Sequence, residues 1–261
     1  MRHFRNAPLW ARLLLATVAA GAAAAVSGGL ILLFVFALAY ANLPSIDTLT
    51  DYQPRIPLRV WTADGVLIGE FGEERRDYVP IQEVPRRVQQ AILAAEDDAF
   101  YRHHGVDYTG LARAFVANFA SGRRGQGGST ITMQVARNFY LSSERSYLRK
   151  IYEIALAYKI ESELTKDRIL EVYANQIFLG QRAYGFSAAA QTYFGKKLPE
   201  LTVGEAAMLA GLPAAPSAYN PWVNPRRAKV RQQYVLSRML ALGFISQREH
   251  DEAAAEPFKA R

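Results

Sequence analysis

The N-terminal apolar run constrains this chain more than any other feature of its sequence. Between Arg12 and Asp47 no residue is charged, and LLLATVAAGAAAAVSGGLILLFVFALAYANL fills most of the interval. A helix needs about 20 apolar residues to cross a bilayer, so this run spans one with residues to spare. The alternative is a cleaved signal peptide, but its apolar core is usually only about 7–15 residues long. We therefore predict a membrane anchor over residues 13–43, which ends before Pro44.

Basic residues before this run predict its orientation. Arg2, Arg5 and Arg12 precede it and no acidic residue accompanies them. The positive-inside rule therefore predicts a cytoplasmic tail over residues 1–12, with the rest of the chain on the outer face of the membrane. The 261-residue chain carries a net charge of +7, which indicates an anionic partner such as nucleic acid, a membrane surface or a phosphorylated substrate. It contains no cysteine, which excludes disulfides, thiolate catalysis and cysteine-based zinc sites.

The exported sequence divides into a small β-containing segment and a helical region. RVWTADGVLIGEFG alternates around Asp64-Gly65, a hairpin signal, so we predict a β-containing stalk over residues 44–80. From Val84 onward the apolar periodicity is helical almost to the end, which predicts a mainly α domain over residues 81–245 and the start of a C-terminal linker over residues 246–261. The expected helical segments are 84–103, 111–121, 129–141, 146–164, 166–179, 185–195, 202–212 and 226–244.

The stretch GRRGQGGST, residues 122–130, comes within one residue of the nucleotide-binding pattern G-x-x-x-x-G-K-[ST]. Gly128 stands where that pattern has lysine, and a helical segment precedes it where a P-loop needs a strand. ATP is also scarce outside the cytoplasmic membrane. The remaining interpretations are an ordinary glycine turn with a helix cap, or a helix start whose backbone N–H groups bind another anion.

Two groups of charged residues are candidates for chemistry. Glu96 lies at the edge of its helix's apolar stripe, where desolvation would raise its pKa toward the range of a general base or acid; a solvated acidic helix end is the alternative. Glu153 is the second candidate, because four basic residues would surround it if two helices meet. Such a cluster would hold a pyrophosphate, whereas the alternative is a surface ion pair with Arg149. The four basic residues are Arg137, Arg145, Arg149 and Lys150.

The order of these signals resembles one family. The successive motifs are Glu96-Asp-Asp-Ala-Phe100-Tyr-Arg-His103-His-Gly105, Gly128-Ser129-Thr130-Ile-Thr-Met-Gln134-Val-Ala-Arg137-Asn138, Arg149-Lys150-Ile-Tyr-Glu153 and Lys166-Asp-Arg-Ile-Leu170-Glu-Val-Tyr173-Ala-Asn175. In this order they resemble the peptidoglycan glycosyltransferases, found as monofunctional enzymes and as the N-terminal half of class A penicillin-binding proteins. The resemblance covers roughly residues 55–245 and implies a mainly α, lysozyme-like, two-lobed domain.

The resemblance also implies an activity. Enzymes of this family polymerise lipid II into β-1,4-linked glycan with inversion, and undecaprenyl pyrophosphate leaves. The residue matching Glu96 deprotonates the acceptor hydroxyl, and the one matching Glu153 lies near the donor pyrophosphate, where it acts through a divalent cation (Mg²⁺ or Mn²⁺) or orients basic groups. No organic cofactor is expected. Other residues implied to line the substrate cleft are Asp97, Phe100, His103, Ser129, Thr130, Gln134, Arg137, Arg145, Arg149 and Lys150.

The implied location is the bacterial inner membrane, with one membrane pass and a periplasmic catalytic domain. Lipid II, the lipid-linked glycan, the membrane and other cell-wall synthesis and division proteins are the implied partners, and nucleic acid is not. We also expect the helix at residues 111–119 to dip into the lipid surface through Leu111, Phe115, Val116 and Phe119; core packing is the alternative.

Departures from the family pattern are few. Met133 stands where glutamine is common, and Arg137 where lysine is common, which keeps the charge but changes its geometry. No S-x-x-K or K-T-G occurs, so the penicillin-binding transpeptidase signature is absent, and the chain is either monofunctional or part of a longer protein. Two other functions stay open: a lysozyme-like lytic hydrolase, and a membrane-anchored scaffold without catalysis.

Overall fold

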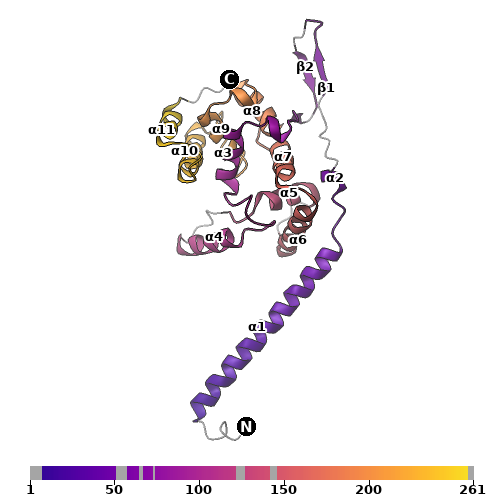
Figure 1. Cartoon of the computed structure of the whole chain (residues 1–261), viewed down its shortest axis with the longest axis vertical. Helices are drawn as coiled ribbons and strands as arrows, with labels where there is room; N and C mark the ends of the chain where they lie inside the picture. Colours follow the sequence, from indigo (N-terminus) through magenta and orange to yellow (C-terminus); the bar gives the residue numbers. More distant parts are fainter. Residues whose placement is uncertain are drawn as a thin grey trace.

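The protein is mainly α-helical, with one long helix standing apart from a compact helical body (Figure 1). The computed structural model describes residues 8–50, 58–64, 67–72, 74–121, 127–141 and 146–257. A mainly α fold with one apolar N-terminal helix confirms the predicted fold class.

The long helix is α1, Leu9–Ala41, whose 33 residues are almost all exposed. Its mean hydropathy reaches 2.4, so α1 is long and apolar enough to cross a membrane. Its C-terminal end contacts helix α6, Tyr147–Glu163. There the rings of Phe36 and Tyr158 meet edge to face with centroids 6.4 Å apart, and Lys159 Nζ donates to the Pro44 carbonyl at 2.8 Å.

The predicted hairpin is present. Strand β1, Leu58–Trp61, pairs antiparallel with β2, Leu67–Phe71, and the register slips between Val60 and Trp61. The short helix α2, Asp47–Thr50, precedes it. A second sheet was not predicted: β3, Arg75–Arg76, pairs in parallel with β4, Ala183–Tyr184. These two-residue strands lie more than 100 positions apart, so no local pattern marks their pairing.

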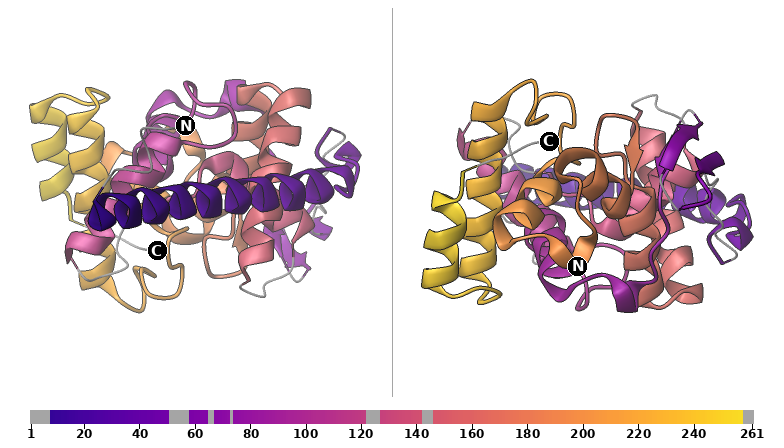
Figure 2. Two further views of the ribbon diagram at one scale, coloured as in Figure 1. Left: turned by 90° about the horizontal axis from the view of Figure 1, so that it is seen from below. Right: turned by 90° about the horizontal axis from the view of Figure 1, so that it is seen from above.

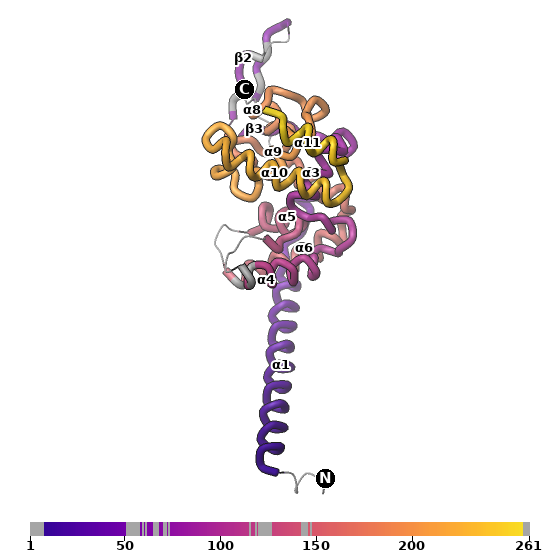
Figure 3. Tube along the Cα trace, turned by 90° about the vertical axis from the view of Figure 1, so that its left-hand side faces the viewer, coloured from indigo at the N-terminus to yellow at the C-terminus, as the bar shows by residue number. Residues whose placement is uncertain are grey.

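The body forms two groups of helices. Helices α4 to α6 lie nearest α1, while α3 and α8 to α11 lie farther away (Figures 1 and 3), and α10 and α11 pack side by side at one edge (Figure 2). The 3-10 turns are Ile81–Glu83 and Leu198–Glu200. The helices not yet bounded are α3 (Arg86–Glu96), α4 (Tyr108–Ser121), α5 (Ile131–Tyr140), α7 (Lys166–Gln176), α8 (Phe186–Phe194), α9 (Val203–Gly211), α10 (Pro225–Ala241) and α11 (Gln247–Ala255).

The core is centred on α9, which packs against both α3 and α10. Small residues make this close contact possible: Ala206, Ala207 and Ala210 of α9 are buried, and a Cβ atom at Gly211 would lie only 2.8 Å from Cγ of Arg231. Because interiors are close-packed, this tight seam fixes α10 relative to the end of α3.

The largest differences from the predicted helices are at α3 and α11. Helix α3 ends at Glu96, whereas the periodicity predicted a helix to residue 103, because Asp97 turns away and bonds to groups distant in sequence. Part of the predicted linker is helical: α11 begins after Ser246, whose side chain caps the helix while Glu249 bonds back to the Ser246 backbone. That capping box is a sequence signal for a helix start.

Candidate active site

A cavity of about 500 Å³ lies between the two groups of helices. Its walls come from the end of α3, the first half of α4, residues 127–130, α5 and α10. Six residues predicted for the site line it: Glu96, Asp97, Ser129, Thr130, Gln134 and Arg137. Side chains that are distant in sequence therefore converge on one partly open cavity.

Glu96 is the last residue of α3 and presents its carboxylate to this cavity. Oε2 accepts a hydrogen bond from Gln134 Nε2 at 2.8 Å. Oε1 is buried and has no hydrogen-bond partner among the described residues. Burial raises the pKa of Glu96; the Gln134 bond and the charges of Arg231 and Arg137 oppose this, and Asp97 adds to it. The net result is a carboxylate with raised basicity and one uncommitted oxygen.

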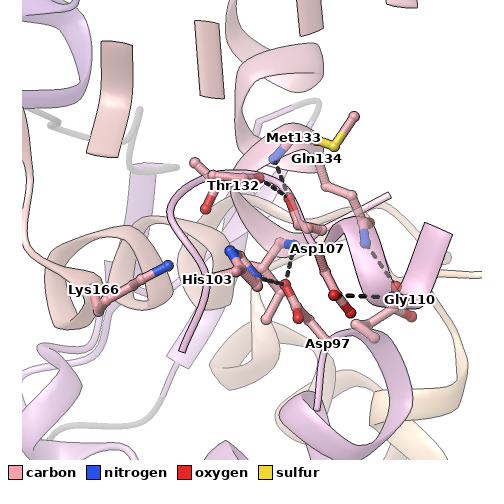
Figure 4. Close-up of polar contacts among 12 residues, drawn as sticks. Asp97, His103, Asp107, Gly110, Thr132, Met133, Gln134 and Lys166 are labelled. Atoms are coloured by element: carbon pink, nitrogen blue, oxygen red, sulfur yellow. Dashed lines mark hydrogen bonds and ion pairs between the residues drawn. The ribbon is translucent and has the colours of Figure 1, made fainter. Parts of the chain in front are cut away.

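Asp97 lines the cavity, but its carboxylate bonds to other groups of the protein (Figure 4). Its Oδ2 accepts from the Ile131 backbone N–H at 3.0 Å and pairs with His103 Nε2 at 2.9 Å. His103 and Phe100 do not line the cavity: the His103 side chain is buried behind Asp97, and Phe100 lies in the core with Lys166 Nζ 4.5 Å from its ring centroid. These three residues fix the turn after Glu96.

The start of α5 has acceptors for some of its own N–H groups. The Ile131 N–H bonds to Asp97 and the Met133 N–H to Thr130 Oγ1, while the Gln134 N–H makes the first bond within the helix, to the Thr130 carbonyl. Thr130 Oγ1 in turn donates to the Gly105 carbonyl at 2.6 Å. Two of the N–H groups that precede the first helical bond are therefore occupied, and the interpretation of residues 127–130 as an anion site stays a prediction.

Arg149 and Lys150, two of the four basic residues predicted to surround Glu153, form a basic cluster with it. This carboxylate is 1% exposed, and it pairs with Lys150 Nζ at 2.9 Å and Arg149 Nε at 3.3 Å. Lys150 Nζ also donates to Ser129 Oγ at 2.9 Å, which connects the cluster to the cavity wall. The remaining predicted residue, Arg145, lies outside the described residues.

One wall of the cavity was not assigned from the sequence. Helix α10 contributes Arg231, Tyr234 and Arg238. The Arg231 guanidinium lies 4.6 Å from the Tyr234 ring centroid, Nε donates to the Gly211 carbonyl at 3.3 Å, and Arg238 pairs with Asp98. A signal existed, because spacings of three and seven residues place these side chains on one helix face. Asp107 was likewise unassigned; it lines the cavity and caps α4 by accepting from the Gly110 N–H (Figure 4).

Metal binding has little support from protein groups alone. No set of three or more His, Asp and Glu side chains within the described ranges is arranged to hold a metal ion.

Comparison with known proteins decides the family. The transglycosylase family matches residues 64–240, which include every site residue described above. The chain belongs to the transglycosylase family. The recognition of the family is thereby confirmed, and so is the expectation that the chain carries a peptidoglycan glycosyltransferase domain.

Relatives of this transglycosylase domain are longer proteins. Penicillin-binding protein 1A of Neisseria flavescens is 57% identical over 217 residues, covering 83% of this chain and 27% of the relative. Penicillin-binding protein 1A of Pseudomonas aeruginosa is 51% identical over 234 residues, covering 89% and 28%. The crystal structure of penicillin-binding protein 1A from Haemophilus influenzae matches with 35% identity and a TM-score of 0.47, covering 80% of this chain and 22% of that one. The chain thus spans about a quarter of the length of these curated relatives.

Proposed function

We propose that this transglycosylase domain polymerises lipid II into β-1,4-linked glycan, with Glu96 as the general base. The observation that carries the proposal is the environment of Glu96. Gln134 holds one carboxylate oxygen, the other is buried without a hydrogen-bond partner in the described part of the chain, and burial raises the pKa. A base of this kind removes a proton efficiently near neutral pH.

The proposed reaction begins at Oε1 of Glu96. Oε1 of Glu96 takes the proton from the 4-hydroxyl of the acceptor sugar, whose oxygen attacks C1 of the lipid-linked donor chain. The C1–oxygen bond to the pyrophosphate breaks as the new bond forms, so the configuration at C1 inverts. Undecaprenyl pyrophosphate leaves with the bonding electrons, and the proton stays on Glu96 until it passes to solvent.

The basic cluster suits the leaving group. Lys150 reaches Ser129 at the cavity, and Arg137 lines the same cavity. Cations at these positions stabilise the negative charge that grows on the departing pyrophosphate. Glu153 orients Lys150 and Arg149 by pairing with both. Mg²⁺ or Mn²⁺ bound mainly by pyrophosphate oxygens is compatible with this arrangement, but no step above depends on it.

The anchor agrees with a lipid-linked substrate. We assign α1 to a single pass through the bacterial inner membrane, with the helical body on the periplasmic face. Lipid II, the lipid-linked glycan and the membrane are the proposed partners, together with other proteins of cell-wall synthesis and division.

A polymerisation assay tests the proposal. The full chain in detergent is incubated with lipid II, and glycan length is compared for wild type, Glu96→Gln and the control Glu163→Gln, which changes an exposed glutamate of α6. We expect long glycan from wild type and the control, and a loss of about 10²-fold or more for Glu96→Gln, with an unchanged circular dichroism spectrum. Full activity of Glu96→Gln would exclude Glu96 as the base.

The same proteins test the two alternatives. Preformed glycan is added in place of lipid II. Shortening of this glycan without polymerisation of lipid II would indicate a lytic hydrolase, for which the cationic groups at the cavity have no evident use. A scaffold predicts neither reaction, and predicts that Glu96→Gln supports growth as well as wild type does.

A further inference from the structure

Tyr173 of α7 carries a buried polar group that the reaction above does not use. The residue is 1% exposed and belongs to the main core. Its hydroxyl has no hydrogen-bond partner among the described residues. An unsatisfied buried hydroxyl destabilises the fold, and phenylalanine would fill the same space without that cost.

Four charged residues act electrostatically on this hydroxyl. Burial raises the pKa of Tyr173 well above its usual value, and the carboxylate of Glu96 raises it further. Arg137 and Arg231 act in the opposite direction, and Asp97 in the same one. All four charged residues line the cavity, and Tyr173 does not. The hydroxyl is therefore buried in the core, within electrostatic reach of the charged residues of the cavity.

A second oxygen in this region also lacks a partner. Glu96 Oε1 is buried without a hydrogen bond within the described part of the chain, whereas Oε2 is held by Gln134. A hydroxyl is a donor and an ionised carboxylate accepts two bonds on each oxygen. One bond between Tyr173 and Oε1 would satisfy both orphaned atoms and still leave Oε1 a lone pair for a substrate hydroxyl.

We propose that the Tyr173 hydroxyl donates a hydrogen bond to Glu96 Oε1 during the reaction and acts as a positioning residue for the base. Gln134 and Tyr173 then hold the carboxylate at both oxygens and fix its plane toward the acceptor. The two oxygens are not hydrogen-bonded in this structure, and hydrogen bonds at catalytic groups often tighten only when substrate binds. This inference rests on the proposed function of Glu96.

Tyr173→Phe removes only the hydroxyl. We expect kcat for lipid II polymerisation to fall about tenfold or more, as for loss of a hydrogen bond to a charged group, with KM unchanged. The acidic limb of the pH–rate profile should move to higher pH, because the lost donor stabilised the ionised carboxylate. Asp97, Asp98, Arg137, Arg231 and Arg238 keep their charges in this variant, so the shift reports the hydroxyl.

The control is Tyr193→Phe. Tyr193, a residue of α8, is equally buried, but its hydroxyl donates to the Leu179 carbonyl. We expect this variant to lower the melting temperature without moving kcat or the acidic limb. A purely structural Tyr173 predicts the reverse for Tyr173→Phe: unchanged kcat and pH profile, with an equal or higher melting temperature.

A second variant covers the case in which Tyr173→Phe does not fold. Replacing Tyr173 by 3-fluorotyrosine keeps the packing and strengthens the hydroxyl as a donor, so the acidic limb should move to lower pH. An unmoved limb in this protein, or an unchanged kcat in folded Tyr173→Phe, overturns the inference. If wild type polymerises no lipid II at all, the proposed function fails instead, so the two failures are distinguishable.

Discussion

Glu96 shows at the scale of one residue how the site trades stability for reactivity. Its pKa is raised mainly by burial, so the folded protein prefers the protonated form more than the unfolded chain does. Because protonation and folding are linked, the stability that Glu96 contributes is complete below its unfolded-state pKa and is lost as pH rises through the folded-state pKa. At neutral pH an ionised Glu96 therefore destabilises the fold.

We predict that Glu96→Gln melts at the same or a higher temperature than wild type at neutral pH. Glutamine avoids the buried charge and still accepts the bond from Gln134, so the variant keeps the free energy of unfolding that wild type loses when Glu96 ionises. Each unit of pKa difference between the folded and unfolded states corresponds to about 1.4 kcal/mol. The advantage should shrink as pH falls and wild type becomes protonated. Thermal melts across this pH range check it, with Glu163→Gln as the control. A lower melting temperature at neutral pH would contradict the prediction.

Site residues that could be predicted from the sequence lie in short motifs, whereas those that were missed on α10 reach the site only through helix packing. Glu96, Gln134 and Arg137 belong to short motifs and do line one cavity. Arg231 lies 135 positions after Glu96 and lines the same cavity because α10 packs directly on α3 as well as on α9. Phe100 and His103 belong to the same motif as Glu96 but support the turn from behind. A motif identifies which residues belong to a site, but only packing separates its lining from its supports.

At the scale of elements, the end of α3 and the start of α5 hold each other. Asp97 bonds to the first N–H of α5, and Thr130 caps that helix while donating to Gly105. Apolar periodicity could not reveal that α3 ends at Glu96, because the cause is a contact with residue 131. The missed helix α11 was encoded locally, in the capping box of Ser246 and Glu249.

We predict that Thr130→Ala both destabilises the protein and lowers its activity. Loss of an N-cap costs about 1 kcal/mol, and loss of the buried bond to Gly105 adds about 1 kcal/mol more. Because Gln134 lies one turn into α5, its hydrogen bond to Glu96 should weaken, and polymerisation should slow. Thr165→Ala is the matched control, because Thr165 caps α7 and is exposed. Chemical denaturation and lipid II turnover measure the two effects; equal behaviour of the two variants would contradict the prediction.

Helix α4 lies at the end of the body nearest α1 (Figures 1 and 3), and two of its apolar side chains are exposed. Val116 is 64% exposed and Phe119 is 83% exposed. Leu111 lines the cavity instead, and the side chain of Phe115 lies outside the described set. Exposed apolar groups at this end suit insertion into a lipid surface. Of residues 111–119, we therefore expect Val116 and Phe119 to enter the lipid.

We predict that protein lacking residues 1–43 still binds liposomes of anionic lipid without detergent, and that Val116→Asn with Phe119→Asn abolishes most of this binding. Burial of such side chains is worth about 1.5–3 kcal/mol each, so the partition coefficient should fall by about 10²-fold or more. Val223→Asn with Val230→Asn, two exposed valines elsewhere, is the matched control. Cosedimentation measures binding. Equal cosedimentation of both double variants would indicate that α4 does not enter lipid.

At the scale of the whole molecule, α1 is attached to the helix that carries the basic cluster. Its end meets α6 through Phe36 and Tyr158, and Lys159 bonds to Pro44. Two turns earlier on α6, Lys150 and Glu153 face Ser129 at the cavity. An anchor fixed to α6 therefore sets the height of the cavity above the membrane, where a lipid-linked pyrophosphate would lie.

The orientation of α1 decides whether that cavity meets substrate outside the cytoplasm, and the absence of cysteine makes it measurable. Arg2, Arg5 and Arg12 precede α1, so the positive-inside rule places the N-terminus in the cytoplasm. We predict that Arg248→Cys, an exposed position on α11, reacts with a membrane-impermeant maleimide in intact spheroplasts. Asn6→Cys should react only after lysis. Wild type, having no thiol, is the control for background labelling. If Asn6→Cys reacts before lysis and Arg248→Cys does not, the helical body lies in the cytoplasm and cannot polymerise an exported lipid-linked sugar.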